Sequence, residues 1–106
     1  FPTRRSSDLK KVREILANGW TQEASARDAE GEPLFSTDPR ACSFCILGAV
    51  WRAVGYENQM ESRLVYALRN AIGEDAKLVS YNDTPGRTQD EMLALVDKAI
   101  ENIKEE

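Results

Sequence analysis

The chain has 106 residues, of which 42% are hydrophobic and 30% are charged, and this composition is typical of one ordinary globular domain. Its formal net charge of −4 argues against a protein that binds nucleic acid backbones through clustered lysine and arginine. No apolar run approaches the roughly 20 residues of a membrane span, and no signal peptide is recognisable. With two cysteines, we expect a reduced, cytoplasmic setting.

Histidine is absent from the sequence. This removes the commonest general base and the commonest zinc ligand. An enzyme with this sequence would have to use carboxylates, a thiolate or a lysine. We expect no metal and no other cofactor.

Residues 1–9, which read Phe-Pro-Thr-Arg-Arg-Ser-Ser-Asp-Leu, resemble translated sequencing-adapter DNA that stands in front of unrelated predicted proteins. We therefore treat them as a non-native prefix and expect a single globular domain over residues 10–106. Within the prefix, Ser7 or Asp8 can still cap a first helix, and Leu9 is in phase with the apolar face of that helix.

The first helix is predicted to continue to Asn18 because apolar residues recur at helical spacing, with Gly19 as its stop. Residues 20–35 have no clean helical face and contain the turn sequence Asp-Ala-Glu-Gly at 28–31. This pattern predicts a short, irregular β-hairpin that leans on the helices.

An almost entirely apolar run over 41–51 predicts a central buried helix over 38–54. Asp38 is the expected N-cap, and Pro39 the first helical residue. Because a glycine inside a helix costs about 1 kcal/mol relative to alanine, we expect a close contact at Gly48.

A third helix is predicted from a capping box of Asn58 and Glu61 to Ile72, with Gly73 as its stop. Residues 77–83 favour a short helical turn that ends at Asn-Asp.

The last helix begins with a second capping box, formed by Thr88 and Glu91. Its apolar residues make the strongest helical pattern of the chain: Met92, Leu95, Val96, Ala99, Ile100 and Ile103. The predicted fold is therefore mainly α, with about four helices around the helix 38–54 and a small β-hairpin near 20–35.

Cys42 and Cys45 form a C-x-x-C motif. Such a motif can be a redox pair at a helix N-terminus or half of a zinc site. The predicted helix starts at Asp38, which would place both cysteines well inside it, so we favour two small core residues. Four further residues are either core or pocket walls: Trp51, Arg52, Tyr66 and Arg69.

The polar stretch from Asn82 to Thr88 is the best candidate for a ligand site. Free N–H groups at the start of the last helix, together with Gly86 and Arg87, favour an anion. Capping and turn formation explain the same residues as structure alone. We expect Arg27 and Asp28, next to the hairpin turn, to form a second wall of the same site. The predicted ligand-binding residues are therefore Arg27, Asp28, Asn82, Asp83, Arg87 and Thr88.

Several short motifs in combination resemble one uncharacterised family of small proteins from bacteria and their phages. They are Trp20-Thr21-Gln22, Ala26-Arg27-Asp28-Ala29, Asp38-Pro39, Cys45-x-x-Gly48-Ala49 and Asn82-Asp83-x-Pro85-Gly86-Arg87-Thr88. Phe44 departs from the tryptophan that the family usually carries there, which suggests a packing role. The resemblance implies no known activity.

We predict a non-enzymatic binding module for a small polar or anionic ligand or for a partner protein. Because the resemblance extends to phages, a counter-defence role such as sequestering a nucleotide signal is one hypothesis. A small enzyme that uses Cys45, or the carboxylates of Asp28 and Asp83, is the first alternative. A structural protein that forms a homodimer is the second.

Overall fold

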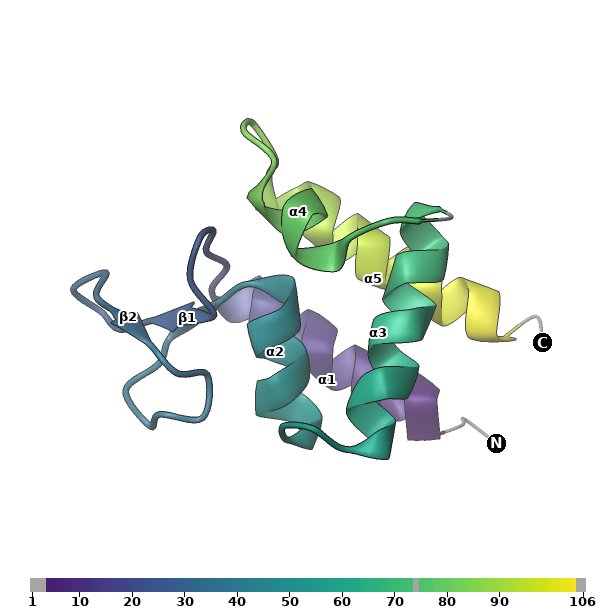
Figure 1. Ribbon diagram of the computed structural model, residues 1–106, viewed down its shortest axis with the longest axis horizontal. Coiled ribbons are helices and arrows are strands. Elements are labelled where there is room, and N and C mark those ends of the chain that lie inside the picture. The colour runs from purple at the N-terminus through teal and green to yellow at the C-terminus, as the bar shows by residue number, and fades with distance from the viewer. Residues whose placement is uncertain (1–3, 74, 105–106) are drawn as a thin grey trace.

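The computed structural model describes residues 4–73 and 75–104, so the first three residues of the predicted prefix lie outside it. The prediction of a mainly α fold is confirmed, with five helices and three short strands in the described residues (Figure 1). The helices are α1 (Arg4–Asn18), α2 (Ile46–Val54), α3 (Gln59–Ile72), α4 (Leu78–Asp83) and α5 (Gln89–Lys104). Ser7 and Asp8 lie inside α1, so the prediction that one of them caps its start is wrong. The strands are β1 (Ala26–Arg27), β2 (Pro33–Leu34) and β3 (Ser43–Phe44).

The core lies between α1, α2, α3 and α5, and it is filled by the apolar stripes that the sequence pattern predicts. Fully buried side chains include Leu9, Val12, Leu16, Leu64, Leu68, Met92 and Val96. Gln89 at the start of α5 donates from Nε2 to the carbonyl oxygen of Leu16 over 2.8 Å, which fixes α5 against the end of α1. No helix in the described part of the chain is long and apolar enough to cross a membrane.

The capping box predicted at the start of α5 is confirmed. Of the one predicted for α3, the structure shows the Asn58 cap, whereas Glu61 Oε1 accepts from Trp51 Nε1. Asn58 accepts a hydrogen bond from the N–H of Glu61 over 2.8 Å at the start of α3. At the start of α5, the N–H of Thr88 donates to Glu91 Oε1 over 2.9 Å, and the N–H of Glu91 donates to Thr88 Oγ1 over 3.2 Å. The short helical turn predicted before Asn82-Asp83 is also confirmed, as α4.

The prediction of one helix over 38–54 is wrong. The Asp38 carboxylate accepts from the N–H of Arg40, and the carbonyl oxygen of Asp38 accepts from Ala41, so these residues close a turn. The chain then runs alongside β1, where the N–H of Cys42 donates to the carbonyl oxygen of Arg27 over 2.9 Å. This pairing takes residues 43–44 into a strand that an apolar run alone does not distinguish from a helix.

The three strands form an antiparallel sheet in the order β2-β1-β3, and Ala26 of the central strand lies opposite Leu34 and Phe44. The predicted hairpin near 20–35 is thus confirmed as β1 and β2, whereas the third strand of the sheet, β3, was not predicted. Trp20 adds a parallel bridge to Phe44. The hairpin projects to one side of the helices, as Figure 1 shows.

Two glycines let backbone segments approach closely. A Cβ atom on Gly48 would overlap the carbonyl oxygen of Ser25, and one on Gly19 would overlap the carbonyl oxygen of Cys42. The expected close contact at Gly48 is therefore confirmed, and its partner is the loop over residues 20–25. This approach leaves Leu47 and Trp51 of α2 half-exposed beside that loop, so α2 is not buried on all sides as predicted.

Candidate functional site

The site is built around the meeting of two segments that are about 60 residues apart in sequence: residues 20–25 and residues 81–88. Asn82, which is fully buried, joins them. Its Oδ1 accepts from Trp20 Nε1 and from the N–H of Ile46, both over 2.9 Å. Its Nδ2 donates to the carbonyl oxygen of Thr21 over 3.1 Å and to Asp83 Oδ1 over 2.9 Å. Asn82 therefore holds α4 against the start of α2 and against the loop.

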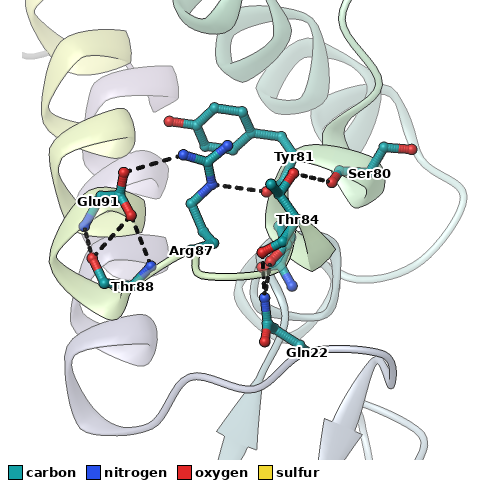
Figure 2. A network of polar contacts seen from close by, with 8 residues as sticks. Gln22, Ser80, Tyr81, Thr84, Arg87, Thr88 and Glu91 are labelled. Carbon is teal, nitrogen blue, oxygen red and sulfur yellow. Dashed lines mark hydrogen bonds and ion pairs between the residues drawn. The ribbon is translucent and has the colours of Figure 1, made fainter.

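Further hydrogen bonds join the same two segments. Gln22 donates from Nε2 to the carbonyl oxygens of Asn82 and Thr84, over 3.0 and 3.1 Å (Figure 2). The N–H of Glu23 donates to Asp83 Oδ1 over 2.9 Å. Glu23 has a φ of 64°, a left-handed conformation that is uncommon for a residue other than glycine. The loop over residues 20–25 is thereby held in one path.

Arg87 folds back onto α4 instead of reaching into solvent. Its guanidinium carbon lies 3.7 Å from the centre of the Tyr81 ring, and its Nε donates to the carbonyl oxygen of Tyr81 over 3.0 Å. Its Nη1 also donates to Glu91 Oε2 over 3.2 Å, a contact that Figure 2 marks. Thr88 forms the capping box of α5. These intramolecular partners use the cation and the hydrogen-bonding groups that favoured an anion site in the sequence.

Arg27 and Asp28 organise the hairpin. Arg27 donates from Nε to Thr21 Oγ1 over 2.9 Å, and from its two terminal nitrogens to the carbonyl oxygens of Gly31 and Gln22. Asp28 Oδ1 accepts from two turn N–H groups, both over 2.9 Å. The Arg27 side chain thus braces the same loop that Asn82 holds from the other side.

A pocket of about 440 Å³ opens where this loop meets α2 and α4. Its apolar lining comes from Ala24, Leu47, Trp51 and Val79, and its polar lining from Glu23, Ser25, Cys45 and Asp83. We call the carboxylates of Glu23 and Asp83 its acidic rim. Of the six predicted ligand-binding residues, only Asp83 lines this pocket.

Sequence reasoning named Trp51 as a candidate wall but missed most of the other lining residues. Leu47 and Trp51 are one helical turn apart, so α2 presents both to the pocket once its register is known. Val79 is 44% exposed, which is unusual for an apolar residue next to the buried Leu78. The sequence of two adjacent apolar residues does not indicate which of them faces outwards.

Cys45 is the N-cap of α2 and not an interior helical residue as predicted. Its Sγ accepts from the N–H of Gly48 over 3.2 Å, and the residue is only 5% exposed. Burial raises the pKa of the Cys45 thiol, and the negative charge of Asp83 acts in the same direction. The thiol that lines the pocket is therefore protonated at neutral pH, which lowers its nucleophilicity.

Cys42 is exposed, which corrects the prediction that both cysteines lie on one buried helix face. The two residues flank strand β3, and three residues of extended chain span about 10 Å. A disulfide needs Cα atoms within about 7 Å, so this pair cannot close one without moving the backbone. In the part of the chain that the structure describes, no group of three or more cysteine or acidic residues could hold a metal ion.

The family model "Family of unknown function (DUF6197)" matches residues 1–102. The chain belongs to this family, which confirms the predicted resemblance to an uncharacterised family. No curated protein and no solved structure matches the sequence.

Proposed function

We propose that this member of a family of unknown function is a non-enzymatic binding module, and that its ligand enters the pocket between residues 23–25, α2 and α4. The observation that carries the proposal is an apolar pocket with an acidic rim. It lies where residues 20–25 meet residues 81–88, two segments that contain motifs of the family resemblance. Its volume of about 440 Å³ is within the range of small-molecule sites.

The lining indicates an apolar body for the ligand. Leu47, Trp51 and Val79 offer aliphatic and aromatic surface, and burying such surface stabilises a complex by about 25 cal/mol per Å². Leu47 and Trp51 project from α2, whose position is held by Asn82 and by the close approach at Gly48. A wall held in this way is organised before the ligand arrives, which reduces the entropy lost on binding.

The acidic rim favours a cationic or hydrogen-bond-donating end. Asp83 Oδ1 already accepts from Glu23 and Asn82, whereas no donor among the described residues contacts its Oδ2. An amine can donate to that oxygen in a charge-assisted hydrogen bond. The anionic ligand expected from sequence is less favoured, because the guanidinium groups of Arg27 and Arg87 are engaged by the protein itself. The same argument weighs against sequestering a nucleotide signal.

A small enzyme remains the second candidate because Cys45 and Asp83 line the same pocket. A thiol nucleophile must lose its proton, however, and burial opposes this. Asp28, the other carboxylate of that alternative, is bonded into the hairpin turn and does not line the pocket.

The proposal can be tested with two probes of similar shape and opposite charge, 2-phenylethylamine and 3-phenylpropionate, titrated into ¹⁵N-labelled protein. We expect the amine to shift the amide resonances of residues 23–25 and Leu47, and the carboxylate to bind more weakly. Replacement of Asp83 by Asn keeps the shape and an acceptor oxygen, and should weaken amine binding by about tenfold, the loss expected for one charge-assisted hydrogen bond.

Asp90→Asn, on the first turn of α5, is the matched control and should leave amine binding unchanged, because Asp90 does not line the pocket. Equal or stronger binding of the carboxylate would refute the acidic rim as the recognition element. Shifts confined to residues outside the pocket would refute the site itself.

A further inference from the structure

An exposed aromatic cluster continues the apolar surface of the pocket. It consists of Phe35, Trp51 and Tyr56. Phe35 stacks on Trp51 with ring centres 5.8 Å apart and an angle of 14° between the rings. Tyr56 meets Trp51 edge-on at 4.8 Å and Phe35 edge-on at 5.7 Å. Because Trp51 belongs to both the cluster and the pocket lining, the two apolar surfaces are continuous.

The cluster presents a large aromatic surface to solvent. Phe35 and Tyr56 are each 50% exposed, and Val79 at the pocket is 44% exposed. Soluble domains seldom display contiguous apolar surface without a partner, and aromatic side chains supply much of the energy of protein interfaces. Three separate segments contribute the rings: the residue after β2, helix α2 and the connection from α2 to α3.

The charged side chains that line the pocket are acidic. Glu23 and Asp83 are the charged residues of the pocket lining, and Glu61 accepts a hydrogen bond from Trp51 Nε1 over 3.1 Å. The nearest described arginine on α2, Arg52, donates to the carbonyl oxygens of Ser36 and Asp38, over 3.1 and 3.0 Å. Its charge is thereby held at the turn that follows Phe35, and Arg52 does not line the pocket.

We propose that the pocket and the aromatic cluster together form one docking groove for a segment of a partner protein that carries an apolar anchor side chain and at least one lysine or arginine. The anchor fills the pocket, the basic residue pairs with the acidic rim, and the neighbouring residues of the segment cover Phe35 and Tyr56. The pocket half of this inference rests on the proposed function, whereas the aromatic half is an addition to it.

Charge decides between a basic partner and a second copy of this chain. In a two-fold dimer the same surface faces itself, which would bring two acidic rims together in a chain of net charge −4. A basic segment instead finds complementary charge at the edge of an apolar groove, the arrangement that favours association and specificity.

A displayed library of random 12-residue peptides, selected on the purified full chain, tests the groove. We expect the enriched peptides to share one aromatic or large aliphatic residue and at least one lysine or arginine. The affinity of a synthetic consensus peptide is then measured for the variants Phe35→Ser and Tyr56→Ser. Each should weaken peptide binding by roughly tenfold, as for a residue at the centre of an interface, and should weaken binding of 2-phenylethylamine less, because neither side chain lines the pocket.

Tyr66→Ser is the matched control, because Tyr66 is 65% exposed and lies outside the cluster. It should bind the peptide as the parent chain does. Far-ultraviolet circular dichroism of each variant shows whether it is folded. Asp83→Asn should weaken both the peptide and the amine.

Three results would overturn the groove. Selection of acidic peptides, or of none, would exclude a basic partner segment. Peptide binding that is insensitive to both Phe35→Ser and Tyr56→Ser would remove the cluster from the site. A dimer in solution that Phe35→Ser dissociates would show that a second copy covers this surface. In each case, amine binding at the pocket would leave the proposed function standing.

Discussion

At the scale of single residues, one buried amide organises three segments of the chain. Asn82 uses both hydrogens of its Nδ2 and makes two hydrogen bonds through its Oδ1, with partners in the loop, in α2 and in α4. A buried polar side chain with every group paired specifies a unique arrangement, whereas an unpaired one is costly. The asparagine that sequence analysis placed in a ligand site is therefore a structural centre directly behind the pocket.

Replacement of Asn82 by Ala should lower the free energy of unfolding by about 3 kcal/mol or more. It leaves the indole N–H of Trp20, the N–H of Ile46 and the carbonyl oxygen of Thr21 without their buried partner, at about 1–3 kcal/mol each before relaxation. Urea denaturation measures this change. Asn70→Ala, on the exposed face of α3, is the control and should change stability by no more than about 0.5 kcal/mol. Similar values for the two variants would contradict the role of Asn82.

At the scale of elements, the helices differ in what determines where they start. α3 begins at Asn58, whose side chain accepts from the N–H of Glu61, and α5 begins at a capping box, in which Thr88 and Glu91 satisfy each other's N–H groups. α2 begins at Cys45, and its first N–H is satisfied by Asn82 from a different helix. Local capping makes the starts of α3 and α5 independent of the rest of the fold, whereas the start of α2 depends on α4.

The capping box of α5 predicts a pH dependence of stability. The hydrogen bond from the N–H of Thr88 holds the pKa of Glu91 below its usual value of 4.5. Because the pKa is lower in the folded state, the carboxylate stabilises the protein above that value and loses this contribution as the pH falls through the folded pKa. Glu91→Gln keeps an acceptor but removes the titration, so the parent chain should exceed it in stability at pH 7, with a difference that shrinks as the pH falls below the usual pKa of 4.5.

Urea denaturation of both proteins across this range checks the pH dependence of α5. Glu101→Gln, at an exposed position of the same helix outside the capping box, serves as the control for the loss of one carboxylate. A Glu91→Gln difference that stays constant, or grows on acidification, would show that the Thr88 N–H does not favour the ionised form.

At the scale of the whole molecule, the fold depends on two close approaches, in which the loop over residues 20–25 and the strand β3 pack against helices. The loop over residues 20–25 lies on α2 at Gly48, and β3 lies against the end of α1 at Gly19. Both contacts are between backbones, so they leave no room for a side chain. The pocket exists because this approach sets the loop beside Leu47 and Trp51.

Replacement of Gly48 by Ala should destabilise the protein, opposite to its usual effect inside a helix. The helical preference of alanine contributes about 1 kcal/mol in favour, but the added methyl group overlaps the carbonyl oxygen of Ser25 and forces the loop to move. We expect a net loss of about 1–3 kcal/mol in thermal or urea unfolding, and a loss of the same sign for Gly19→Ala. A gain in stability would show that the loop can move away freely.

The candidate site was harder to predict than the fold because its motif residues had two roles that a sequence cannot separate. Arg27, Asn82 and Arg87 carry hydrogen-bonding capacity that capping alone does not require, and this surplus suggested a ligand. The structure gives each of them partners within the chain. The pocket behind them has walls from segments far apart in sequence, and no spacing rule relates Ala24, Leu47 and Val79.

The mainly α class, the limits of α3, the start of α5, the hairpin turn and the short helix that ends at Asp83 can all be predicted from the sequence alone. All of these depend on residues within a few positions of one another, where periodicity and capping operate. The start of α2, strand β3 and the pocket become visible only in the folded chain. Each of these depends on hydrogen bonds or close approaches between residues far apart in sequence, such as Arg27 with Cys42 and Ile46 with Asn82, and a local pattern carries no information about such pairs.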